Sequence, residues 1–400
     1  MFAEVQDSLG QIPGHAVFFG VLGGLLWGFG PLGKRYSVAG AHPKLKAARS
    51  AGTYFVCSLG AIVTPAVRLA FIEDTERLEV LANASWRSRA PFIVLAGAAS
   101  GLGGLMGTCA LALANTNSTA LITMIENGTY AVMASMFIAG AFQEHPAPLQ
   151  YLSAALVLMG IIVMQADGLG EGSSRSKGTA TDSPGEVEGL LGDDCDSCAG
   201  KEASSHQAKA AIFGPTALTP GMRHECHYGS SAQLIISGGK ERKAKGASSA
   251  LAFAVTGGVL WAIGPLGKRW GVDSAPVELR GAYASCTSFL FAFGVLLTSA
   301  CAVFRATATH PEGFFDPEWA VRVPLVLASG AMSGLGGFVG TYALALVGHE
   351  ASSVVAILEN GVFTVAGALL IAVVFREQPT TRQIWGAMPI VAAVFLAQLG

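Results

Sequence analysis

The strongest constraint on the fold is a pair of long apolar runs, residues 118–142 and 351–375, each with one glutamate inside it. Each run is long enough to cross a bilayer as a helix, which takes about 20 residues. Glu126 and Glu359 are both followed by Asn-Gly. Because a carboxylate inside a bilayer is costly, such residues usually face a cavity, a partner side chain or a transport path. We therefore expect a membrane protein with an internal duplication.

The composition also favours the lipid bilayer as the partner of this chain. Apolar residues make up 52% of the sequence and charged residues 13%, about half the charged share of a globular protein. The 51 glycines suit helices that pack closely in a membrane. The net charge of −2 indicates nothing about partners. The sequence has no basic stripe that would bind nucleic acid, so we expect no nucleic-acid partner.

We predict an all-α integral membrane fold with ten transmembrane helices and four segments along the chain. Residues 1–15 form an N-terminal tail, 16–165 a first five-helix repeat, 166–247 a disordered polar linker and 248–400 a second five-helix repeat. The expected helices span residues 16–33, 50–71, 91–114, 118–142, 149–165, 248–267, 281–304, 323–347, 351–375 and 383–399.

Four matched motifs support the duplication, and they occur in the same order in both halves. The pairs are WGFGPLGKR (27–35) with WAIGPLGKR (261–269), SGLGGLMGTCALAL (100–113) with SGLGGFVGTYALAL (333–346), IENG (125–128) with LENG (358–361), and QEHP (143–146) with REQP (376–379). An odd number of helices per half makes the halves insert in opposite senses. Transporters built from such inverted repeats bind substrate near the midplane, where the repeats meet.

The segment 166–247 is rich in glycine, serine and threonine and has low hydrophobicity, which is typical of disorder. It contains a metal-like pattern, Cys195 and Cys198 followed by cysteine and histidine at 224–227. A structural zinc site needs four ligands on an ordered frame, so we expect no metal site here.

Glu126 and Glu359 are the main candidate functional residues. One interpretation is a carboxylate that lines the substrate cavity or alternates between a coupling proton and the substrate. The alternative is a protonated carboxyl group that is hydrogen-bonded to a neighbouring helix. The adjacent amides, Asn127 and Asn360, are candidates for lining the same cavity or for bridging helices.

The repeated WxxGPLGKR motif supplies a second set of candidates. Pro31 and Pro265 each remove a helix donor and bend the helix, so the kinked helix is a candidate gate or cavity wall. Trp27 and Trp261 lie inside the apolar runs, where each ring either packs or faces the pore.

Lys34 and Lys268 follow the apolar stretches of these helices. Snorkelling to the interface and a favourable position near a helix C-terminus explain them without function. The alternative is contact with an anionic substrate near one mouth of a transport path.

Enzyme motifs are missing from the sequence: there is no G-x-S-x-G, H-E-x-x-H or Walker pattern. We therefore expect no catalytic residue and no cofactor, and an intramembrane enzyme is weakly supported.

The sequence resembles the EamA branch of the drug/metabolite transporter superfamily over all of the chain except the linker. The resemblance rests on the Trp27-Gly28 pair and its Trp261-Ala262 counterpart, on the third helix rich in small residues, and on a fourth helix followed by a Glu-containing turn. In that family the fourth helix often carries Glu-Pro and ends in a Gly-Glu turn, whereas this chain has Glu126-Asn127 and Gln143-Glu144.

This resemblance implies a ten-helix carrier that works by alternating access. The expected substrate is a small metabolite or drug-like solute, with a proton as a candidate coupling ion. A carrier of phosphorylated sugars would be expected to show Lys or Arg inside its late helices, and Arg376 and Arg382 lie in a loop, which argues against that branch. The alternative function is a receptor or scaffold that kept the carrier fold and works through its linker.

Overall fold

The computed structural model describes residues 13–114, 119–143, 235–309, 316–347 and 352–376, with scattered residues in 152–163 and 381–396. These residues form helices and turns, and no strand occurs among them. The chain divides into one unit of residues 1–171 and 240–400 and another of residues 172–239. The first unit holds the apolar helices.

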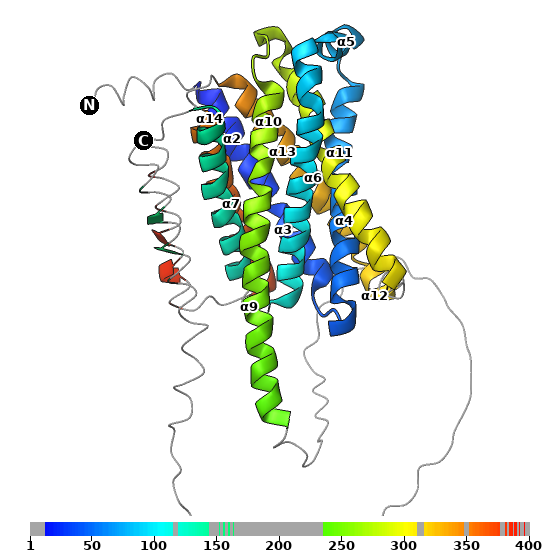
Figure 1. Ribbon diagram of the computed structural model, residues 1–400, viewed down its shortest axis with the longest axis vertical. Coiled ribbons are helices and arrows are strands. Elements are labelled where there is room, and N and C mark those ends of the chain that lie inside the picture. Colours follow the sequence, from blue (N-terminus) through cyan, green and yellow to red (C-terminus); the bar gives the residue numbers. More distant parts are fainter. Residues whose placement is uncertain are drawn as a thin grey trace, which may run out of the picture. The chain divides into compact units, whose positions relative to one another are not determined.

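The helices that precede residue 172 form a bundle with short connections (Figure 1). They are α2 (Gly14–Trp27), α3 (Phe29–Val38), η1 (Pro43–Leu45), α4 (Lys46–Ala70), α5 (Asp74–Ala82), α6 (Ala84–Leu113) and α7 (Thr119–Ala141).

The later helices repeat this order: a broken long helix, a 3-10 helix, a long helix, a short helix and two long helices. They are α9 (Ile235–Trp261), α10 (Ile263–Val272), η2 (Val277–Leu279), α11 (Arg280–Thr309), α12 (Pro317–Ala320), α13 (Val323–Leu346) and α14 (Ser352–Phe375).

Seven stretches of the described residues are long and apolar enough to cross a membrane, as in a multi-pass integral membrane protein. They are Gly14–Val38, Pro43–Ala70, Ala84–Leu113, Ser248–Val272, Val277–Thr309, Val323–Leu346 and Leu358–Phe375. The expected helices 149–165 and 383–399 lie almost wholly outside the described residues, as do most of the expected tail and linker. The end of that linker is helical, because α9 already begins at Ile235.

Near both expected kinks the helix is interrupted by one residue, Gly28 or Ala262, whose backbone angles stay in the right-handed helical region. A proline has no N–H to donate to the carbonyl four residues earlier. For Pro31 that carbonyl belongs to Trp27, and for Pro265 it belongs to Trp261. These are the last residues of α2 and α9. The two prolines therefore place each tryptophan at the end of a helix segment, in the middle of the bundle.

Glycine brings the first helix of each half against helices of the other half. A Cβ atom added to Gly23 of α2 would lie 3.1 Å from the carbonyl oxygen of Gly336 in α13. A Cβ atom added to Gly257 of α9 would lie 2.9 Å from the carbonyl oxygen of Gly103 in α6. Close approach of this kind is the use of small residues in membrane helices. The two halves therefore interlock, with α2 on α13 and α9 on α6.

One end of the bundle is held by Arg49, Asp316 and Trp319, which we call the α12 clasp. Arg49 of α4 is buried and forms an ion pair with Asp316, just before α12. The Trp319 indole Nε1 donates hydrogen bonds to Ser37 Oγ, at 2.8 Å, and to Thr53 Oγ1, at 3.2 Å. The clasp ties α12 to α3 and α4.

The other end is held by Trp86, Arg89 and Asp273, which we call the α6 clasp. The indole of Trp86 donates to Thr287 Oγ1 at 3.4 Å. Arg89 Nη1 lies 3.2 Å from the Asp273 carboxylate. Because α5 and α12 lie at opposite ends of the bundle, each end has one clasp (Figure 1).

Candidate functional site

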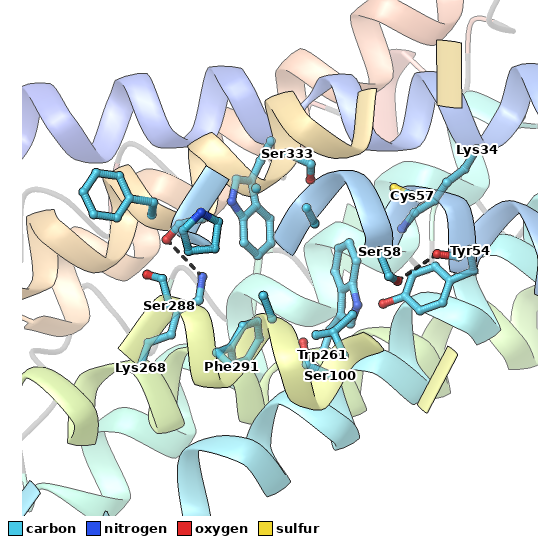
Figure 2. Close-up of a pocket in the computed structure, with 18 residues that line it drawn as sticks. Lys34, Tyr54, Cys57, Ser58, Ser100, Trp261, Lys268, Ser288, Phe291 and Ser333 are labelled. Atoms are coloured by element: carbon cyan, nitrogen blue, oxygen red, sulfur yellow. Dashed lines mark hydrogen bonds between the residues drawn. The ribbon is translucent and has the colours of Figure 1, made fainter. Parts of the chain in front are cut away.

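A cavity lies inside the bundle, between α3, α4, α6, α10, α11 and α13 (Figure 2). The space open to the centres of water molecules is about 80 Å³. One water needs roughly 10–15 Å³ of such space, so the cavity has room for several waters or for a small polar group.

Positions with the same sequence spacing line this cavity from both halves. The spacing that relates Trp27 to Trp261 also relates other pairs of lining residues. These pairs are Lys34 and Lys268, Tyr54 and Ser288, Cys57 and Phe291, Ser58 and Ala292, and Ala61 and Val295. Ser100 and Ser333, from the SGLGG motifs, also line it. The site is therefore built about equally by the two halves.

Four aromatic rings pack together at the centre of the bundle. Trp27 and Trp261 belong to the cavity lining, and Tyr130 of α7 and Phe363 of α14 lie against them. All six centroid distances among these rings lie between 5.5 and 6.3 Å. The rings give the cavity a rigid apolar wall.

Lys34 and Lys268 lie in the cavity lining rather than at a mouth. Lys34 is 5% exposed, and its Nζ lies 4.7 Å from the ring centroid of Trp261 and 4.9 Å from that of Tyr54. Lys268 is 4% exposed, and its Nζ lies 4.5 Å from the ring of Trp27 and 4.9 Å from that of Phe291. Each ammonium thus faces the tryptophan of the other half. Such burial does not fit snorkelling, in which the charged head stays in water.

Glu126 and Glu359 are buried, at 5% and 6% exposed, but they are not among the residues that line the cavity. A Cβ atom added to Gly107 of α6 would collide with the Glu126 carboxylate, and one added to Gly340 of α13 would collide with that of Glu359. Each carboxylate therefore fills the space that a glycine leaves open on the third long helix of its own half.

Each glutamate lies one helical turn before a ring of the aromatic cluster. Tyr130 comes after Glu126 on α7, and Phe363 comes after Glu359 on α14. The charge of Lys34 acts on Glu126 and that of Lys268 acts on Glu359. In the described part of the chain, however, neither lysine makes an ion-pair contact with a carboxylate. The carboxylates thus lie close behind the cavity lining.

Four other sequence candidates are buried and do not line the cavity: Asn127, Asn360, Pro31 and Pro265. Asn127 and Asn360 are each 1% exposed. The Asn127 side chain and the Asn360 Nδ2 have no hydrogen-bond partner among the described residues. Pro31 and Pro265 lie in the first turns of α3 and α10, just after the helix breaks. Trp27 and Trp261, from the WxxGPLGKR motif, do line the cavity.

Sequence reasoning missed the serines and Tyr54. Ser100 and Ser333 open the two SGLGG motifs, which we used only as evidence for the duplication and for helices rich in small residues. Tyr54 and Ser288 occupy matched places on α4 and α11, where sequence identity between the halves is low. Comparing polar residues at equal spacing in the two halves could have found that pair.

Metal chemistry has no site among the described residues, where no group of three or more His, Cys, Asp or Glu side chains gathers. The cysteines and histidines considered as ligands in the linker lie outside the described residues.

Comparisons with known proteins do not assign a family. No family model matches the chain. No curated protein matches it. A solved structure titled "Crystal structure of protein" is similar, with 15% sequence identity over 96% of each chain and a TM-score of 0.48.

Proposed function

We propose that this protein is a ten-helix membrane transporter of the EamA type, built from two inverted five-helix repeats. It moves a small metabolite or drug-like solute by alternating access. The observation that carries the proposal is the cavity, which is lined by matched residues of the two halves near the middle of the bundle. Transporters built from inverted repeats bind their substrate where the repeats meet.

The inverted arrangement is supported by the ends of the bundle. The short helices α5 and α12 hold corresponding places in the two halves, before α6 and α13. They lie at opposite ends of the bundle (Figure 1), as expected when one half is turned over relative to the other. The expected helices 149–165 and 383–399 complete the two repeats.

Alternating access needs a closure at each end that can open while the other stays shut. The two clasps fit this need. The α12 clasp joins α12 to α3 and α4, and the α6 clasp joins α6 to α10 and α11. Rocking of one half on the other releases one clasp and exposes the cavity to one side of the membrane.

Glu126 and Glu359 are the groups that couple the solute to a proton in this proposal. Both are buried close behind the lining and feel the charge of a lining lysine. Protonation removes the negative charge beside that lysine and so changes the field in the cavity. Proton binding and solute binding are thereby linked.

The experiment is solute flux into liposomes that contain the purified full chain. We expect uptake of at least one member of a solute panel, driven or accelerated by an imposed pH gradient. The double variant Glu126→Gln, Glu359→Gln is expected to lose the response to the gradient. Glu278→Gln, which changes an exposed carboxylate, should behave as wild type. A pH response that survives the double substitution removes the glutamates from the mechanism.

A further inference from the structure

We propose that the cavity is an oxyanion site, so that the solute carried is a small organic anion held by Lys34 and Lys268. This inference rests on the proposed function for transport, but the site itself can be tested without it.

The cavity lining carries a surplus of positive charge. Lys34 and Lys268 are the charged residues that line the cavity, and both are more than nine-tenths buried. The carboxylates whose charge acts on them, Glu126 and Glu359, lie outside the lining and make no ion-pair contact with them. A buried ammonium is costly unless it is paired. The ring faces and the nearby glutamates supply part of the compensation, and an anion in the cavity would contact the ammonium groups directly.

Donors without acceptors gather beside Lys268. The Trp27 indole Nε1 and the Ser288 Oγ are buried and have no hydrogen-bond partner among the described residues. Lys268 Nζ makes one long hydrogen bond, 3.5 Å, to the carbonyl oxygen of Gly337. All three side chains line the same cavity, and Figure 2 shows Ser288 beside Lys268. An ammonium, an indole N–H and a hydroxyl together suit the oxygens of a carboxylate or phosphate.

The second lysine occupies a matched position in the cavity. Lys34 lies with Tyr54 on the opposite side of Trp261 from Lys268 (Figure 2). Lys34 and Lys268 occupy equivalent positions in the two halves of the sequence. The two ammonium groups can therefore contact the same anionic group in turn, one from each side of the aromatic rings. In the alternating cycle, each can receive the anion from its own end of the cavity. The wall of aromatic rings between them fits an apolar or planar body.

The test uses iodide, an anionic quencher of tryptophan fluorescence, on the purified full chain at constant ionic strength. A cavity with unpaired cations concentrates anions beside Trp27 and Trp261. Replacing Lys34 and Lys268 together by methionine should lower the iodide quenching constant at least about twofold, because the local anion concentration falls. Quenching by acrylamide, which is neutral, should not change.

Three controls make the result specific. Lys44→Met removes an exposed positive charge and should leave iodide quenching unchanged. Lys268→Arg keeps the positive charge and should retain most of the wild-type iodide quenching constant. Circular dichroism and gel filtration establish that each variant is folded.

Competition identifies the oxyanion. Succinate or inorganic phosphate should protect the wild type from iodide, and the one that protects more strongly distinguishes a carboxylate from a phosphate site. Succinamide, the neutral counterpart of succinate, should not protect. Equal iodide quenching in wild type and the double methionine variant contradicts the proposal, as does protection by succinamide or by neither anion.

Flux measured on the same proteins separates the two proposals. If iodide quenching depends on the two lysines but no solute is taken up, the oxyanion site is supported and the proposal of a carrier is contradicted. Uptake of neutral solutes that is unchanged in the double methionine variant keeps the carrier and overturns the oxyanion site.

Discussion

At the residue scale, we expect the buried lysines of the cavity to serve ligand binding at a cost in the stability of the ligand-free protein. Lys34 and Lys268 are buried without a carboxylate contact among the described residues. A buried ammonium lowers stability unless it is paired, and a methionine of similar length removes that cost. We therefore expect Lys34→Met with Lys268→Met to raise the unfolding temperature of the ligand-free protein in detergent. A fall in that temperature contradicts the idea that these lysines serve binding rather than folding.

Gly107 and Gly340 leave the space that the carboxylates of Glu126 and Glu359 occupy. Gly107→Ala places a Cβ atom in the space of the Glu126 carboxylate. Overpacking of this kind typically costs about 1–3 kcal/mol, so the unfolding temperature and the flux should both fall. The control is Gly140→Ala on α7, where an added Cβ meets nothing within 4 Å. That change should be neutral or stabilise by up to about 1 kcal/mol.

Among the helices, the clasps fix short elements onto the bundle ends. Asp316→Asn leaves the buried Arg49 without its ion-pair partner. Removing one partner of a buried pair costs about 3–5 kcal/mol, and we expect somewhat less here because Asp316 is partly exposed. The matched control is Asp74→Asn, which breaks the exposed pair with Arg77. That pair should contribute less than about 1 kcal/mol. Thermal unfolding of both variants measures the difference, and equal losses would contradict a locking role for the clasp.

The helices also show what could be predicted from sequence. Apolar length and the prolines of the WxxGPLGKR motif indicated the helices and the breaks that the structure describes. The inward position of Lys34 and Lys268 could not be predicted, because a lysine near a helix end usually reaches the interface. Their burial depends on rings from other helices: Tyr54 and Phe291 from the next long helices, and Trp261 and Trp27 from the opposite halves of the chain.

For the molecule as a whole, we propose that the helical unit alone would carry the proposed transport. Residues 172–239 form a unit of their own. Replacing residues 172–234 by a flexible linker of equal length leaves α9 intact, so solute flux should stay close to wild type. A receptor or scaffold that works through this segment would instead lose its partners, while any flux lost with the segment contradicts our assignment.

The proposed transport cycle requires that one cavity between the two halves opens in turn to each side of the membrane. Cys57 lines that cavity and is buried, which makes it a natural reporter. The measurement uses protein in which the other six cysteines are replaced by serine, in liposomes of known orientation. A membrane-impermeant, negatively charged methanethiosulfonate is added to one side at a time. We predict that Cys57 is modified from either side and that modification blocks flux. Modification from one side alone, or from neither, would contradict alternating access through this cavity.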